Sequence, residues 1–153
     1  MQTFRDNAGR TWTIAVDIAG VKRVRTALSV DLMEFLEGRL LHRLVSDPVL
    51  LCDILYVLCR PEADRGGVSD EDFGRAMGGD TIEHATRALV EALVSFSPNP
   101  RDRENLRRVV QAMHTAMEKA RDITARRLDE RLEQTTEQVL ANAGDLSGDS
   151  PES

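Results

Sequence analysis

The sequence predicts a mainly α-helical (α+β) protein: an N-terminal β-hairpin packed on a small helical bundle, followed by a long projecting C-terminal helix. Only six of 153 residues are aromatic (four Phe, one Trp and one Tyr), so aliphatic side chains must build the core, which favours helices. Apolar and polar residues alternate only near the start, and elsewhere apolar residues recur at helical spacing. No glycine or proline occurs between Pro100 and Gly144.

The hairpin is predicted within the first 16 residues. Turn-forming residues 6–9 separate a short strand from residues 10–16, in which Trp12, Ile14 and Val16 share one face. Phe4 is expected to meet Trp12 across the two strands. Because an isolated hairpin is only marginally stable, this one must pack on helices.

Two helical segments follow the hairpin. Asp17 is the expected N-cap of the first. Its buried stripe is predicted to contain Ile18, Val21, Val24 and Leu28. The second segment covers residues 32–45, and Gly38 inside it leaves either a kink or two short helices open.

Asp47 and Pro48 predict the start of the next helix, with the aspartate as cap and the proline at the first helical position. Residues 49–59 are apolar almost all round, as in a helix buried on several sides. Arg60-Pro61 is expected to end it, and residues 62–68 are expected to form a loop.

Ser69 is predicted to open a short helix that turns Phe73, Ala76 and Met77 inward, and the acidic residues 70–72 suit its first turn. Asp80 is the expected cap of a further helix that reaches Phe96. Residues 97–100, which include two prolines, are then expected to end this helix.

Three parts of the chain are therefore expected: a hairpin and helical core over 1–99, a charged amphipathic helix over 100–143, and a disordered acidic tail over 144–153. The first half of the long helix is expected to pack on the core. Its second half has few apolar residues, so it projects, frays or pairs with another chain.

Composition and motifs argue against several classes of protein. There is neither an apolar run of about 18 residues, as a transmembrane helix needs, nor an N-terminal signal. Cys52 and Cys59, seven residues apart in an apolar run, are read as two reduced core thiols of a cytosolic protein. No phosphate loop, nucleophile elbow or metal-ligand spacing occurs. We therefore assign no catalytic, metal or cofactor residue and expect no enzyme.

The sequence also argues against nucleic-acid binding, because the net charge is −6 and the arginines of the long helix are interleaved with acidic residues. The remaining candidate site is the long helix itself, as a partner-binding helix or, equally, as a packed first half with a solvated second half. Its candidate partner-binding residues are Met113, Met117, Ile123, Leu128, Leu132 and Val139.

Residues 3–103 resemble the tail assembly chaperones of long-tailed phages and prophages, small proteins encoded just before the tape-measure protein. The resemblance lies in the opening TFRDNAGRTWTIAV, in Asp47-Pro48 before an apolar helix, in Glu71-Asp72-Phe73 with a following Gly-Asp, and in the Ser97-Pro98 ending. After about residue 103 the chain departs from any pattern of that family.

The resemblance implies a non-enzymatic protein of the bacterial host cytoplasm. It would bind the tape-measure protein, and also the tail tube protein, and keep the tape-measure protein soluble during tail assembly. Self-association through the C-terminal helix is a further expected contact. Two alternatives stay open: a structural tail or connector component, and a cellular helical adaptor or nucleic-acid-associated regulator.

Overall fold

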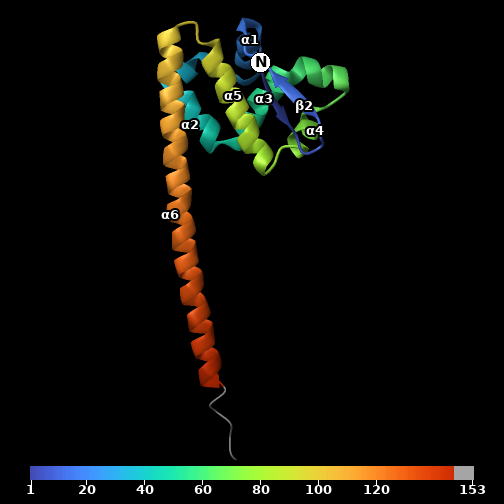
Figure 1. The fold of residues 1–153 in the computed structure, drawn as a ribbon. Coiled ribbons are helices and arrows are strands. Elements are labelled where there is room, and N and C mark those ends of the chain that lie inside the picture. Colours follow the sequence, from blue (N-terminus) through green and yellow to red (C-terminus); the bar gives the residue numbers. More distant parts are fainter. Residues whose placement is uncertain (147–153) are drawn as a thin grey trace, which may run out of the picture. The chain divides into compact units, whose positions relative to one another are not determined.

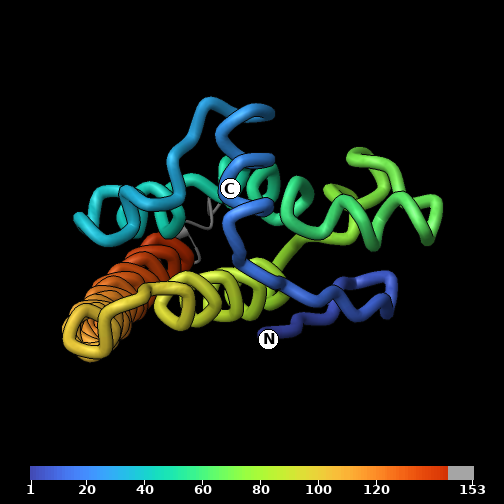
Figure 2. The backbone as a smooth tube through the Cα atoms, turned by 90° about the horizontal axis from the view of Figure 1, so that it is seen from above, coloured from blue at the N-terminus to red at the C-terminus, as the bar shows by residue number. Residues whose placement is uncertain are grey.

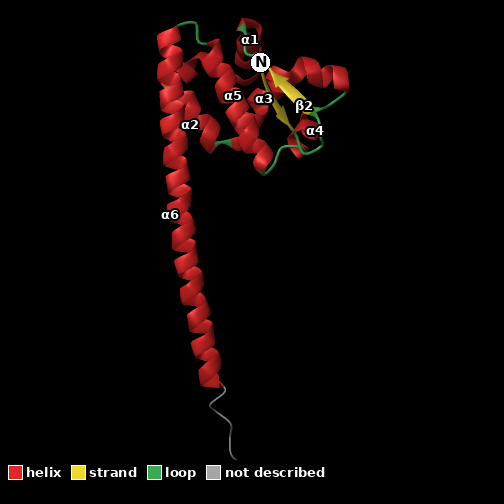
Figure 3. Cartoon of the chain, in the orientation of Figure 1, coloured by secondary structure: helices red, strands yellow, loops and turns green. Residues whose placement is uncertain are grey.

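The computed structural model describes residues 1–146, without the side chains of 145 and 146, and it is mostly helical (Figures 1 and 3). Its elements are β1 (Gln2–Arg5), β2 (Thr11–Ile14), α1 (Ile18–Leu28), the 3-10 helix η1 (Leu32–Glu37), α2 (Arg39–Ser46), α3 (Pro48–Gly66), α4 (Asp70–Arg75), α5 (Asp80–Phe96) and α6 (Pro100–Leu146). The predicted fold class, with its hairpin, helices and long C-terminal helix, is confirmed. Two compact units divide the chain, Met1–Arg108 and a second that begins at Val109.

The hairpin is antiparallel, and Phe4 stands directly opposite Trp12 as predicted. β1 lies against α5, whereas β2 lies against α3 (Figure 2). Trp12 and Ile14 are buried, but the strand ends at Ile14 and Val16 beyond it is only half-buried. Helices therefore pack along both strands of the hairpin. This packing stabilises a two-stranded sheet that would be only marginally stable alone.

The turn of the hairpin is attached to the segment between α4 and α5. The backbone N–H of Asn7 donates to the carbonyl of Ala76 at 2.9 Å. Its side chain donates to the Gly78 carbonyl at 3.3 Å and accepts from the Thr81 hydroxyl at 2.9 Å. These contacts join positions about 70 residues apart in the sequence.

Asp17 caps α1 as predicted, because its carboxylate accepts the N–H of Gly20 at 2.7 Å. The placement of Ile18 in the buried stripe was wrong, since this side chain is 59% exposed. The buried residues of α1 are Gly20, Val21 and Val24. At about 100° per residue, their common face lies roughly 110° around the helix from Ile18.

Gly38 divides the second predicted segment into η1 and α2. It adopts φ +80°, in the left-handed region that glycine enters without steric cost, and it ends η1 while it begins α2. Of the two arrangements left open by the sequence, the structure has two short helices.

The predicted end of α3 was wrong. Asp47 caps the helix and Pro48 occupies its first turn as expected, but the helix continues through Pro61 to Gly66. Gly67, at φ +67°, then ends it, and the N–H of Val68 donates to the Ala63 carbonyl at 2.8 Å. The predicted loop over 62–68 is thus helical up to Gly66.

α3 contacts the edge of β2 at residues on both sides of Pro61. The carboxylate of Glu62 accepts the N–H of Thr13 at 3.2 Å, and the thiol of Cys59 lies 3.7 Å from the Thr13 carbonyl, to which it donates. These tertiary contacts offset the helix hydrogen bond that proline removes. They also occupy the N–H and the carbonyl of Thr13, two of the groups through which an edge strand could pair with another chain.

An aromatic cluster centres on Phe73, which is 1% exposed. Its ring lies 5.1 Å from Trp12, 5.5 Å from Tyr56 and 6.5 Å from Phe4, between ring centroids. The cluster joins α4 to the hairpin and to α3. Ser69 caps α4 as predicted, and its hydroxyl accepts the N–H of Asp72 at 3.1 Å.

The predicted cap of α5 was off by one residue. Gly79, at φ +56° and ψ −130°, occupies the N-cap position, so Asp80 is the first helical residue. No side chain caps this end; Thr81 instead donates its hydroxyl to Asn7. The N–H groups of Thr81 and Ile82 donate to the backbone carbonyls of Gly78 and Gly79 at 3.2 Å, so backbone acceptors serve in place of a side-chain cap.

α6 confirms the predicted helix of more than 40 residues and extends slightly beyond it. Asn99 accepts the N–H of Arg101 with its side chain at 2.9 Å, just before Pro100. The helix includes Gly144–Leu146, so these residues do not belong to a disordered tail. Residues 147–153 of the predicted tail lie outside the described part of the chain.

Candidate functional site

α6 carries a continuous line of mostly apolar residues along one face, which we call the α6 stripe. Each member follows the previous one by three or four residues, so all of them fall within about one third of the helix circumference. The α6 stripe consists of Val110, Met113, Met117, Ala120, Thr124, Leu128, Leu132, Thr135, Val139 and Asn142.

Five of the six predicted partner-binding residues belong to this stripe. Ile123 is the exception, because its position at about 100° per residue places it on a different face. Leu140 and Val109 are also exposed outside the stripe. The helix therefore gathers most, but not all, of the candidate residues on one side.

Exposure divides the stripe into two halves. Val110, Met113 and Met117 are half-buried. Leu128 and Leu132 are each 56% exposed, and Val139 is 60% exposed. We call Leu128, Leu132, Thr135, Val139 and Asn142 the distal stripe. Large apolar side chains this exposed, repeated at helical spacing, suit contact with another helix.

The two threonines within the stripe do not need a polar partner for their hydroxyl protons. Thr124 donates to the Ala120 carbonyl at 2.9 Å, and Thr135 donates to the Arg131 carbonyl at 2.8 Å. Both hydroxyls are thus hydrogen-bonded within α6. They interrupt the apolar character of the stripe less than their residue type suggests.

Charges of opposite sign lie on the two sides of the distal stripe. At about 100° per residue, Asp122, Asp129 and Glu133 fall on one side, which we call the acidic flank. Arg127 and Arg131 fall on the other side, the basic flank. A partner helix that lies on the distal stripe therefore meets acid on one side and base on the other.

The histidines and the acidic triplet form no site within the described residues. His42, His84 and His114 are exposed and lie on α2, α5 and α6. No group of three or more His, Cys, Asp or Glu within residues 1–146 is arranged to hold a metal ion. Residues 70–72 occupy the first turn of α4, where the helix dipole stabilises negatively charged carboxylates.

Both cysteines are free, and neither has the features of a reactive thiol. Burial, with a smaller contribution from the charge of Glu62, raises the pKa of Cys59 to about 12. Burial also raises the pKa of Cys52, as do the nearby carboxylates of Asp53 and Asp70. The thiolate, which is the nucleophilic form, is therefore disfavoured at neutral pH in both, as the apolar setting of the two residues predicts.

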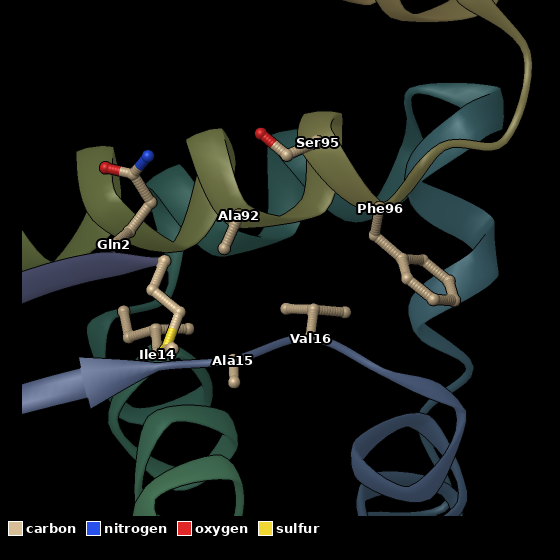
Figure 4. A pocket seen from close by; sticks show the side chains of 8 residues that line it. Gln2, Ile14, Ala15, Val16, Ala92, Ser95 and Phe96 are labelled. Carbon is tan, nitrogen blue, oxygen red and sulfur yellow. The ribbon is translucent and has the colours of Figure 1, made fainter.

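An open pocket of about 320 Å³ lies between the end of the hairpin and the C-terminal part of α5 (Figure 4). Val16 comes from the segment after β2 and Phe96 from the end of α5, and Gln2 and Ser95 contribute the polar side chains. Its lining side chains include no carboxylate, basic group or thiol. Sequence reasoning missed this pocket because its lining comes from segments far apart in the chain.

Comparison with known proteins gives no relative: no protein-family model, no curated protein and no solved structure matches the chain. Within the described residues, no helix combines the length and apolar character needed to cross a membrane.

Proposed function

We propose that this chain is a non-enzymatic tail assembly chaperone of a phage or prophage, and that the α6 stripe binds the tape-measure protein. The observation that carries the proposal is the exposure of Leu128, Leu132 and Val139 on one face of a helix. The resemblance of residues 3–103 to such chaperones supplies the identity of the client.

The physical fit is between two helices. A tape-measure protein is long and helical, and its apolar faces make it prone to aggregate before the tail tube surrounds it. A helix in an apolar groove, or along another helix, is recognised by residues spaced three and four apart. The α6 stripe offers this spacing over about 30 residues, and the chain's net charge of −6 favours solubility of the complex.

The methionines of the stripe suit a client without a single fixed contact sequence. Met113 and Met117 have flexible, polarisable side chains that adapt to irregular surfaces. A chaperone that covers many segments of one long client needs this tolerance more than it needs tight complementarity.

The test is co-expression of the chain with the long protein encoded next to it, with the soluble fraction of that protein as the readout. The wild-type chain is expected to raise the soluble fraction. The double variant Leu128→Glu/Leu132→Glu is expected to abolish this gain, because two carboxylates would lose hydration in the contact.

Leu140→Glu is the matched control, since Leu140 is also exposed on α6 but lies off the stripe. It is expected to solubilise the client as the wild type does. The proposal fails if the neighbouring protein is equally soluble alone, if no long helical protein is encoded beside this chain, or if Leu140→Glu is as harmful as the double variant.

A further inference from the structure

We propose that the distal stripe is covered by a second copy of this chain whose α6 runs parallel and in register with the first. The pairing involves this chain alone and does not depend on the proposed function. Three features of α6 lead to it: the spacing within the distal stripe, the charges beside it, and the position of Asn142.

The spacing changes along the stripe. From Ala120 to Leu132 the steps are four, four and four residues, a pattern that drifts around the helix. From Leu128 to Asn142 the steps alternate between four and three, so the seam returns to the same position every seven residues. That heptad repeat is the pattern of two helices packed knobs into holes. The distal stripe is therefore the part of α6 suited to pairing along its length with another helix as a coiled coil.

The flanks select the direction of the second helix. In a parallel pair related by a two-fold axis, the left side of one helix faces the right side of the other. The basic flank of each copy, Arg127 and Arg131, then faces the acidic flank, Asp122, Asp129 and Glu133, of the other copy. In the antiparallel alignment that matches the two seams, the flanks of one copy lie beside the part of α6 that follows residue 133 in the other copy, so the attraction between flanks of opposite charge is lost. Contacts at this range are screened less than distant charges, so the flanks favour the parallel pair.

Asn142 selects the register. In a parallel, in-register pair it lies level with Asn142 of the second copy, and two amides can each donate to and accept from the other. The antiparallel alignment that matches the two seams places Asn142 opposite Ala125, whose side chain offers no hydrogen bond. A polar residue in a helical seam is known to fix register in this way, at some loss of stability.

Disulfide cross-linking of the full chain tests the direction. Leu128→Cys and Val139→Cys are made separately, and each is expected to form a covalent dimer with itself under mild oxidation. Wild type, with buried Cys59 and half-buried Cys52, sets the background, and Leu140→Cys is the off-stripe control. Cross-linking only when the Leu128→Cys and Val139→Cys variants are mixed would establish the antiparallel pair and overturn the parallel one.

Sedimentation velocity of charge-swapped variants tests the flanks. Arg127→Glu/Arg131→Glu makes both flanks acidic, and Asp122→Arg/Asp129→Arg/Glu133→Arg makes both basic. Each variant alone is expected to sediment at half the mass of the wild-type dimer, and an equimolar mixture is expected to restore the dimer mass. Far-ultraviolet circular dichroism confirms that each variant remains helical. A wild-type chain that stays monomeric at every concentration, or swapped variants that dimerise as well alone as when mixed, would refute the pairing.

Discussion

The indole N–H of Trp12 donates to the carboxylate of Asp6 at 2.9 Å inside the hairpin, where both residues are buried. The same carboxylate accepts the backbone N–H groups of Ala8 and Arg10 at 3.0 and 2.9 Å. Asp6 therefore fixes the turn and ties it to the aromatic side chain that contacts Phe73. A single side chain thus connects the local geometry of the turn to the tertiary core.

Asp6→Ala is expected to lower the free energy of unfolding by about 3 kcal/mol, because it leaves a buried indole N–H and two turn N–H groups without their charged acceptor. Urea unfolding followed by the fluorescence of Trp12 measures the loss. Asp64→Ala is the control, since Asp64 forms an exposed ion pair with Arg60, and a change within about 0.5 kcal/mol is expected there. Equal effects of the two substitutions would show that the Asp6 contacts add nothing.

Pro61→Ala is expected to raise the stability of the chain by about 1–3 kcal/mol, because alanine restores a backbone donor within α3 and removes the clash of the proline ring. Pro48→Ala, at the first turn of the same helix, is expected to lower it by about 0.4–1 kcal/mol, since proline there only restricts the unfolded chain. Chemical unfolding compares the two variants. A loss of stability in Pro61→Ala would mean that the proline is needed to bring Glu62 to Thr13.

Two glycines with open surroundings are expected to respond in opposite directions. Gly38 has φ +80°, so Gly38→Ala is expected to cost about 1 kcal/mol through backbone strain. Gly74 lies within α4, and the space that an added methyl group would occupy there is open, so Gly74→Ala is expected to add about 0.4–1 kcal/mol. Thermal or urea unfolding of both variants checks the sign, and the same sign for both would contradict the backbone explanation.

Stability is expected to fall as the pH rises above about 9. The pKa of Cys59 is about 12 in the folded chain and 9.0 ordinarily, so between these values the folded state holds a proton that the unfolded state releases. Between these pH values Cys59 therefore lowers the free energy of unfolding by at most about 1.4 kcal/mol for each pH unit.

Cys59→Ala is expected to remove this part of the alkaline slope, whatever it costs at neutral pH through the lost side chain. The free energy of unfolding is measured at about pH 8, 9.5 and 10.5 for both proteins, a range that begins below the ordinary pKa of the thiol. The explanation fails if the two slopes are the same.

Much of the fold follows from short-range patterns in the sequence. The caps at Asp17, Asp47 and Ser69, the Phe4–Trp12 pair and the long α6 were all predicted, because each depends on residues close in the chain or on a simple alternation. Five of the six candidate partner-binding residues share one face for the same reason, since helical spacing alone determines that face.

The tertiary structure decided the features that join distant segments. The part of α3 beyond Pro61 is held by the contact of Glu62 with the edge of β2, and the start of α5, which has no side-chain cap, is joined to the hairpin turn through Thr81 and Asn7. α1 buries the face that contains Gly20, and Ile18 therefore lies on an exposed face. In each case contacts between segments far apart in the sequence outweigh a local preference of about 1–3 kcal/mol. The sequence alone thus determined the elements and the helical face of the candidate site, and only the tertiary structure decided where α3 ends, how α5 begins and which side of α1 is buried.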